Sequence, residues 1–354
     1  MNNKKICIIL KIIILNWIIF IQNFNSYILQ VNTVYNFDGY PITWALYGKI
    51  HGDIFIDGGH GADTTPYSET FSLPKGNNII WASVLIGVWG GNEYNSGWIE
   101  LYLNNTMIKR QDLNGVNDVS TNVLISTHGC YLVIYNITNY LELNTTIELK
   151  VNTGGTSFDG RVYGIILIIL YSVPNKAIKF CIGYGNIGFH YLVQGTYYNS
   201  FSFNFKDTYD PSKFIYSDIY VSYLASSSGE NDYLYFNGIL LDNNAGDESS
   251  GPYFDLDSYN VSDYLKPSNY IEFKRGDESY LHPILAVLKS TYKPGIEEGD
   301  DYIYYNIEEP EQKQSINWLI VEVIVVVGIT IVVFSYQYFL KKKKRKEVSH
   351  NIIR

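Results

Sequence analysis

Two stretches of this chain read almost alike: YNITNYLELNTTIELK at residues 135–150 and YNVSDYLKPSNYIEFK at residues 259–274. They have equal length, seven of their sixteen positions are identical, and several of the others exchange similar residues. Self-similarity at a fixed separation indicates an internal repeat. How far the repeat extends on either side decides the organisation of the chain.

The repeat extends in both directions, and its parts keep the same order. Three further pairs of segments match: LYLNN with LYFNG, GIILIILYSV with PILAVLKSTY, and the apolar NIIWASVLIGVWG with SDIYVSYLASS. Four ordered matches are not expected by chance, so we infer a duplication. Unit one is expected at residues 28–173 and unit two at residues 174–293.

The middle of the chain has the composition of strands. Tyr, Ile, Val, Phe and Thr gather in short apolar runs, and Gly and Asn stand between the runs. β-Branched and aromatic residues favour strands, and no long stretch of the sequence shows helical periodicity. We therefore predict an all-β fold of two tandem antiparallel β-sandwiches of the jelly-roll type, with one membrane-directing helix at each end.

Both ends of the chain read as membrane signals. Residues 1–27 combine a basic start, an apolar run and a polar exit, which is the pattern of a signal peptide; without a clear cleavage site, an uncleaved signal anchor stays open. Residues 316–340 form an apolar run long enough to span a bilayer. The basic tail at residues 341–354 keeps the C-terminus cytoplasmic, so we expect a single-pass membrane protein with an extracellular ectodomain.

The exported part is acidic. Residues 27–315 carry sixteen Lys and Arg against thirty-three Asp and Glu, a net charge near −17. Such a surface repels nucleic acid and anionic membranes, so no nucleic-acid partner is expected. The acidic, apolar-poor segment at residues 294–315 is expected to form a stalk next to the membrane.

The repeated segment predicts its own local structure. In each unit a strand ends at the first tyrosine, and a hydroxyl residue, Thr138 or Ser262, is placed to cap a short helical turn. The aromatic–leucine pair that follows is expected to be buried and the residue before it exposed: Tyr140, Leu141, Tyr264 and Leu265 against Asn139 and Asp263.

Two resemblances to known families accompany these patterns. The repeated turn resembles that of galactose-binding-like jelly-roll modules, which supports the fold and carries no sugar-contacting residue with it. GDIFIDGG, HGCYLVIYNIT and SFDGRVYGIILIILYSV are similar to a domain of unknown function in archaeal (methanogen) surface and adhesin-like proteins. That resemblance covers residues 52–173 and implies a cell-surface role without a known reaction or ligand.

The DGR segment at residues 159–161 is present in unit one and absent from unit two, so its role is expected in unit one alone. Two interpretations of Arg161 are open. Its guanidinium either pairs with Asp159 or another carboxylate and so fixes a loop, or it faces a ligand.

Catalytic chemistry has little support in the sequence. It contains no nucleophile, phosphate-binding or zinc motif, so we expect neither an enzyme nor a cofactor. HGDIFIDGGHGAD could place ligands around a cation such as calcium, although its glycines favour a hairpin turn: His51, Asp53, Asp57, His60 and Asp63. The polar loop DNNAGDE at residues 242–248 lacks the full calcium-loop pattern.

Two covalent modifications are open. Cys130 and Cys181 are the cysteines of the exported part, and they either form a disulfide or stay as two buried free thiols. Among four N-glycosylation sequons, Asn104 and Asn144 lie in expected turns and are the candidates for a glycan.

Two functions are compatible with these patterns. The favoured one is a single-pass cell-surface protein with a structural or adhesive role, whose partner is a surface protein or a glycan. The alternative is an ectodomain that binds carbohydrate or, less favoured, processes it, because tyrosine and tryptophan rings can stack on sugars. A row of exposed Trp or Tyr on one sheet face would favour sugar binding, and aromatic side chains turned inward would favour the structural role. The oligomeric state does not follow from the sequence.

Overall fold

The computed structural model describes residues 38–306 apart from residues 127, 194–195 and 297–298. The described residues form antiparallel strands and short 3-10 turns, without an α-helix, which confirms the predicted all-β class. None of their elements is a helix long and apolar enough to cross a membrane. The predicted signal segment, transmembrane span and basic tail lie outside the described residues.

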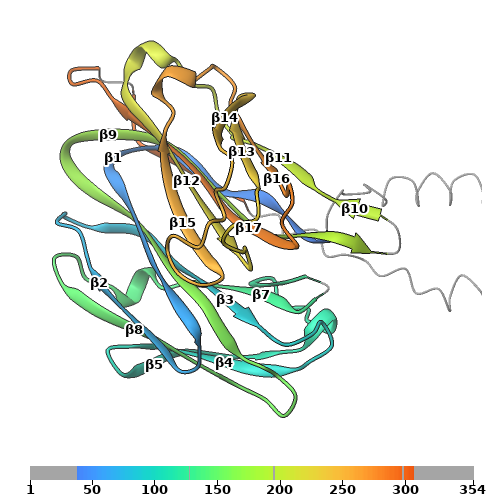
Figure 1. Ribbon diagram of the computed structural model, residues 1–354. Helices are drawn as coiled ribbons and strands as arrows, with labels where there is room; N and C mark the ends of the chain where they lie inside the picture. The colour runs from blue at the N-terminus through green and yellow to red at the C-terminus, as the bar shows by residue number, and fades with distance from the viewer. Residues whose placement is uncertain (1–37, 127, 194–195, 297–298, 307–354) are drawn as a thin grey trace, which may run out of the picture. The chain divides into compact units, whose positions relative to one another are not determined.

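A ten-stranded sheet runs through the described part of the chain (Figure 1). Its main path is, in order, β15 (Phe254–Asn260), β12 (Phe214–Leu224), β17 (Tyr280–Tyr292), β9 (Arg161–Val193), β3 (Ile79–Trp89), β7 (Cys130–Asn136) and β6 (Val123–Ile125). Three more strands pair beside this path: β1 (Asp38–Thr64), β10 (Thr196–Tyr198) and β18 (Tyr302–Tyr305).

Two four-stranded sheets cover the large sheet. One has the order β2 (Tyr67–Ser72), β8 (Thr146–Gly154), β4 (Gly97–Leu103) and β5 (Thr106–Leu113). The other has the order β11 (Ser200–Asn204), β16 (Tyr270–Lys274), β13 (Tyr233–Phe236) and β14 (Ile239–Asp242). Each contributes to its own buried apolar core with part of the large sheet. The 3-10 turns are η1 (Gly115–Asn117), η2 (Thr138–Tyr140), η3 (Pro211–Lys213) and η4 (Ser262–Tyr264).

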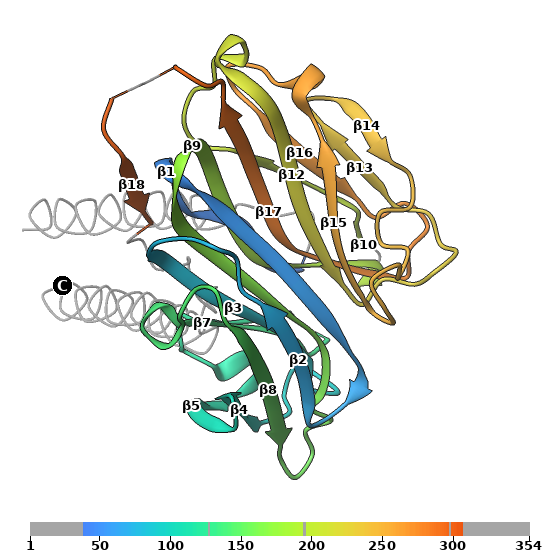
Figure 2. The ribbon, with the colours of Figure 1, turned by 90° about the vertical axis from the view of Figure 1, so that its left-hand side faces the viewer.

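β1 and β9 join the two halves of the structure, which we call the first half (residues 52–172) and the second half (residues 177–292). β1 runs beside β9 in both halves (Figure 2). The register shifts between His51 and Gly52, where the pairing passes from one half to the other. The expected boundary after residue 173 falls at this irregularity, inside β9. The halves therefore share one sheet instead of being linked only by a connecting segment.

A third apolar core lies on the opposite face of the large sheet. Along β9, Ile165 and Leu167 belong to the first core, whereas Ile166 and Ile168 belong to the third. The third core combines side chains of both halves, so the halves pack on each other through this face. A strand buried on both faces needs apolar residues at every position, which explains the unbroken run GIILIIL.

The two halves repeat the same strand order. In the first half the large sheet runs β1–β9–β3–β7, and in the second it runs β9–β17–β12–β15. β9 is thus the last strand of one half and the first strand of the other. The hairpin asparagines also correspond: Asn104 exchanges backbone and side-chain bonds with Glu148, and Asn237 does the same with Tyr270.

The repeated turns occupy equivalent places, η2 between β7 and β8 and η4 between β15 and β16. Their hydroxyl residues do not cap the turns, which corrects the prediction. Thr138 Oγ1 accepts from Ala82 N at 2.9 Å, and Ser262 Oγ accepts from Ser217 N at 2.9 Å. Each hydroxyl therefore binds the neighbouring strand, β3 or β12, because an unpaired N–H of that strand lies within its reach.

Burial in the repeated segment is as predicted for the leucines and not for the tyrosines. Leu141 and Leu265 are buried, and Asn139 and Asp263 are exposed. Tyr140 and Tyr264 are 44% and 39% exposed, so their predicted burial is wrong. The residues that enter the cores lie three positions earlier, at Ile137 and Val261, both wholly buried.

The predicted stalk at residues 294–315 also needs correction where the structure describes it. β18 pairs with β1, Tyr304 stacks on Tyr47 with ring centroids 5.1 Å apart, and Asn306 N donates to Ala45 O at 2.8 Å. Residues 302–305 are therefore a strand of the large sheet, paired with β1. The aromatic residues of YIYY supply the packing that an acidic spacer would lack.

Candidate functional site

The outer face of the sheet β2–β8–β4–β5 carries a row of aromatic and charged side chains. Ile99 and Leu101 of β4 point into the first core and are wholly buried. Since successive side chains of a strand point to opposite faces, Trp98, Glu100 and Tyr102 lie on the outer face, where they are half-buried. The two rings stand four positions apart, roughly 13 Å along the strand.

Glu100 lies at the centre of this outer face. In the sheet register it is opposite Asn152 of β8 on one side and Arg110 of β5 on the other. Tyr102 is opposite Lys150 of β8. A polar stripe thus crosses the sheet between the two aromatic rings.

Hydrogen bonds hold the carboxylate of Glu100 in place. Tyr102 Oη donates to Glu100 Oε2 at 2.8 Å, and Arg110 Nη1 donates to Glu100 Oε1. The bond from Tyr102, followed by the bond and charge of Arg110, lowers the pKa of Glu100, and the bond to Glu100 raises the pKa of Tyr102. Glu100 is therefore a carboxylate at neutral pH, and the Tyr102 hydroxyl is its donor.

The two aromatic rings are each matched with a cation. The Arg110 guanidinium lies 5.1 Å from the centre of the Trp98 ring, and Lys150 Nζ lies 4.9 Å from that of Tyr102. Such cation–π contacts restrain ring and cation together. The face is thus organised before any ligand arrives.

This arrangement suits a ligand with apolar faces and hydroxyl edges. An aromatic ring offers a flat apolar surface, while Arg110 and Glu100 offer donors and acceptors next to it. Beside Glu100, Asn152 Oδ1 is buried and has no hydrogen-bond partner among the described residues. Pyranose sugars combine an apolar C–H face with hydroxyls that both donate and accept.

The second half serves as an internal comparison. With the hairpin asparagines as the common point, Tyr235 corresponds to Tyr102, and Lys274 Nζ lies 4.4 Å from the Tyr235 ring centre as Lys150 does over Tyr102. The Lys–Tyr pair therefore belongs to the repeated scaffold. Trp98 and Glu100 have Asn231 and Tyr233 at the corresponding positions, so the tryptophan–carboxylate combination is particular to the first half.

The segment HGDIFIDGGHGAD is not a hairpin turn, which corrects the prediction. It continues β1, and its residues pair with β9. In a strand, His51 and His60 are roughly 30 Å apart, so they cannot share an ion. No group of three or more His, Cys, Asp or Glu among the described residues is arranged to hold a metal ion.

The candidate metal ligands have separate surroundings. His51 Nδ1 lies 2.6 Å from Asp301 Oδ1, and Asp53 forms ion pairs with Lys176 and, at 3.7 Å, with Lys289. Asp57 Oδ1 accepts from the backbone of Gly58. His60 lies against Gly251, and the side chain of Asp63 is not described.

The loop at residues 242–248 is held by protein groups. Buried Asp232 accepts from Ala245 N at 3.2 Å and from Gly246 N at 2.7 Å. Asp242 Oδ2 accepts from Tyr259 Oη at 2.9 Å. Hydrogen bonds to the backbone and to a tyrosine therefore account for these two carboxylates.

Cys130 and Cys181 are free thiols in the structure, which is the second of the two alternatives. Cys130 and Cys181 are wholly buried, in β7 and β9. Burial raises the pKa of both thiols, that of Cys181 to about 12. The sequon residues Asn104 and Asn144 are exposed in turns with positive φ, where an attached glycan would meet solvent.

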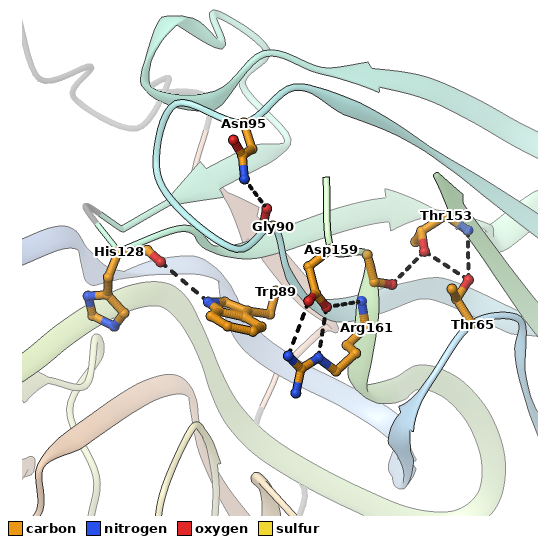
Figure 3. A network of polar contacts seen from close by, with 9 residues as sticks. Thr65, Trp89, Gly90, Asn95, His128, Thr153, Asp159 and Arg161 are labelled. Carbon is orange, nitrogen blue, oxygen red and sulfur yellow. Dashed lines mark hydrogen bonds and ion pairs between the residues drawn. The ribbon is translucent and has the colours of Figure 1, made fainter. Parts of the chain in front are cut away.

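Arg161 pairs with Asp159, as the first of its two interpretations predicts (Figure 3). Its Nε and Nη2 donate to Asp159 Oδ1 and Oδ2 at 2.7 and 3.1 Å, and these bonds lower the pKa of Asp159. The guanidinium stacks 4.4 Å from the ring centre of Trp89, whose Nε1 donates to His128 O at 3.4 Å. This network fixes the loops at one end of the first half.

The aromatic row was not singled out from the sequence, although WIELYL carries its signal. Strict alternation turns Ile and Leu inward, and it therefore places Trp, Glu and Tyr together on the other face. Arg110 and Asn152 could not be assigned to this site, because only the sheet register brings β5 and β8 beside β4.

Comparisons with known proteins give a family and distant structural similarities. The family model described as "Protein of unknown function (DUF3344)" matches residues 35–291. No curated protein matches the chain. A solved peptide-N(4)-(N-acetyl-β-D-glucosaminyl) asparagine amidase is 12% identical, with 74% of this chain and 99% of that chain covered and a TM-score of 0.25.

Two further solved structures are similar at the same level. PNGase F from Flavobacterium meningosepticum is 10% identical over 71% of this chain and 99% of that one, with a TM-score of 0.24. A conserved protein of unknown function from Pseudomonas aeruginosa PAO1 is 8% identical over 71% and 84%, with a TM-score of 0.27. Similarities this distant do not extend to a site or an activity.

Proposed function

We propose that this chain, which belongs to the DUF3344 family of proteins of unknown function, has an adhesive role at the cell surface. In this role the outer face of the sheet β2–β8–β4–β5 binds carbohydrate. Two tandem β-sandwich halves, joined through β9, form the extracellular body. The protein acts as a binding module, and no reaction is assigned to it.

The observation that carries the proposal is the row Trp98–Glu100–Tyr102. Two half-buried rings flank an ionised carboxylate that is already oriented by Tyr102 and Arg110. A sugar chain running along β4 would place apolar faces on the rings and hydroxyls on Glu100 and Arg110. Because these groups are held by the sheet and by each other, little ordering is required when a ligand binds.

Surface location rests on the sequence of the two ends. The signal segment directs export, and the apolar run at residues 316–340 with the basic tail after it anchors the chain with the tail inside. External protease or a membrane-impermeant amine label applied to intact cells should reach the body and spare the tail. Protection of the body in intact cells would contradict the location and leave the binding proposal standing.

Carbohydrate binding is tested on the full-length chain in a zwitterionic detergent, whose headgroup contains no sugar. Soluble oligosaccharides of glucose, mannose, galactose and N-acetylglucosamine are screened on an array and then titrated by calorimetry. At least one should bind, and Trp98→Ala should weaken it by about tenfold or more, equivalent to a loss of about 1.4 kcal/mol. Tyr235→Ala, on the equivalent face of the second half, is the matched control and should bind as the wild type does.

Absence of binding to every oligosaccharide, or unchanged binding by Trp98→Ala, would refute the carbohydrate site. A purely structural role is then the second candidate. It is favoured by the β1–β9 pairing through both halves and by the third core between them, which make the body one continuous unit. Loss of cell-envelope integrity on deletion of the gene, with rescue by Trp98→Ala, would support it.

A further inference from the structure

Three histidines gather where the two halves meet. His128 belongs to the first half, in the connection before β7, while His190 of β9 and His282 of β17 belong to the second half. His128 Nε2 and His282 Nε2 are 2.5 Å apart. The ring centroids of His128 lie 4.5 Å from His282 and 5.9 Å from His190.

Asn186 of β9 ties this cluster to the first half. Its Nδ2 donates to Leu124 O of β6 and to Cys130 O of β7, each at 2.8 Å. Its Oδ1 lies 3.0 Å from His282 Nδ1. The buried amide of Asn186 therefore bridges the two halves and contacts His282.

These contacts determine where the protons lie. Backbone carbonyls can only accept, so both amide hydrogens of Asn186 face Leu124 and Cys130, and Oδ1 faces His282. Oδ1 can also only accept, so His282 Nδ1 carries hydrogen. The neutral ring then has a lone pair on Nε2, which the Nε2–H of His128 satisfies. The series of hydrogen bonds from His128 through His282 to Asn186 is complete when both imidazoles are neutral.

Added protons disrupt this series of hydrogen bonds. A protonated His282 has a hydrogen on Nε2, which then faces the Nε2 of His128 at 2.5 Å. His128 can accept it only after moving its own hydrogen to Nδ1. A second proton leaves two N–H groups and two positive charges facing each other in a site where His282 is wholly buried.

The surrounding charged groups are few. Asp38 of β1 faces His128 and His190 and favours their protonated forms, Arg275 faces His190 and opposes protonation, and the Tyr280 ring lies 4.8 Å from that of His128. Burial outweighs Asp38: it lowers the pKa of His128 to about 4, lowers that of His190, and lowers that of His282 well below its ordinary value. All three rings are neutral near pH 7.

The internal repeat shows that the position of His282 is occupied differently in the two halves. His282 pairs with Leu224 at the end of β12, one pair after a register irregularity, as Arg161 pairs with Trp89 at the end of β3. The first half has at this position a half-exposed guanidinium balanced by Asp159. The second half has a titratable ring buried against the other half.

We propose that His128, His190 and His282 form a proton-operated latch between the halves, closed when the rings are neutral and released when acid charges them. On release, the hydrogen bonds from Asn186 to Leu124 and Cys130 break, and the adjoining ends of β6 and β7 become exposed. β1 and β9 continue through both halves, so the halves stay joined. The latch is independent of the proposed carbohydrate site.

Cys130 is a built-in reporter of the latch. Its carbonyl receives the Asn186 amide, and its thiol is buried in the third core, whereas Cys181 lies in the core of the second half. The full-length protein is labelled with 4,4′-dithiodipyridine, which reacts in acid, and the label is located by peptide mass mapping. Between pH 7 and about pH 4.5, labelling of Cys130 relative to Cys181 should rise by on the order of tenfold.

Variants assign the response to the histidines. His128→Gln and His282→Gln keep a neutral donor in the cluster and should each reduce the acid-induced rise of Cys130 labelling. His51→Gln, which replaces a histidine outside the cluster, should keep the full rise. Full labelling of Cys130 in His282→Gln at pH 7 would mean that this variant has lost the contact between the halves. The result for His128→Gln then decides, because that substitution leaves the Asn186 contacts in place. An unchanged Cys130 rate in acid, equal exposure of both cysteines, or a full rise in His128→Gln would overturn the latch.

Discussion

Leu224 of the second half lies so close to Gly87 of the first half that a Cβ on Gly87 would come within 2.6 Å of Leu224 Cδ1. Gly87 is in β3 and Leu224 in β12, and Leu224 belongs to the third core. The absence of a side chain at one position thus lets the two halves of the large sheet pack face to face. A similar relationship joins Gly164 of β9 to Phe254 of β15.

Gly87→Ala should therefore destabilise the whole body. Overpacking a well-filled core costs about 1–3 kcal/mol, and the added methyl group meets a buried leucine on a second strand. Chemical denaturation should show one transition at lower denaturant concentration. Gly188→Ala is the matched control, because the nearest atom to its Cβ would be 3.3 Å away. Equal effects of the two substitutions would contradict the close packing of the halves.

Leu141→Ala should cost about 2–5 kcal/mol of unfolding free energy, because it opens a cavity in the first core. Tyr140→Ala removes a larger side chain from the next position, but that side chain is 44% exposed, so the cost should be well below that of Leu141→Ala. Thermal unfolding of both variants makes the comparison. The opposite ranking would mean that the turn η2 packs differently.

Thr138→Ala and Ser262→Ala should destabilise the protein by similar amounts, about 1 kcal/mol each. Each removes the hydroxyl that accepts a backbone N–H of the neighbouring strand, from Ala82 or from Ser217. Hydrogen exchange should rise at that amide in the substituted half alone. An effect in one half with none in the other would argue that the two turns are not equivalent.

Stability should fall as the pH rises through the neutral range. Burial, with further contributions from Glu230 and Asp232, raises the pKa of Glu278 to about 9. An acid that holds its proton more tightly in the folded state stabilises the fold fully below its unfolded pKa, about 4.3, and this contribution is lost as the pH rises towards 9. Denaturant midpoints measured between pH 6 and pH 9 should therefore decrease.

Glu278→Gln should flatten that decrease, because the amide keeps a neutral side chain at the same place. Glu142→Gln, at an exposed position of the first half, should leave the pH dependence as it is in the wild type. The prediction fails if the glutamine variant at position 278 loses stability with pH as steeply as the wild type.

Local patterns in the sequence were sufficient for the strands, the repeat and part of its turn. Apolar runs rich in β-branched residues predicted an all-β fold, and the paired segments predicted η2, η4 and the burial of Leu141 and Leu265, because these features depend on neighbours within a few positions. Capping by Thr138 was predicted from the same logic and was wrong. Its hydroxyl accepts from the backbone N–H of Ala82, 56 positions away in β3, and not from its own turn.

The tertiary structure alone decided how the two halves are joined and where their sites lie. HGDIFIDGGHGAD reads locally as a turn, yet pairing with β9 over its length makes it a strand. The register of three strands brings Arg110 and Asn152 to Glu100, and the packing of the halves brings His128 to His282, 154 residues away. The alternation of inward and outward side chains within one strand follows from the sequence of that strand. Contacts between distant strands depend on register and packing, which no local pattern specifies.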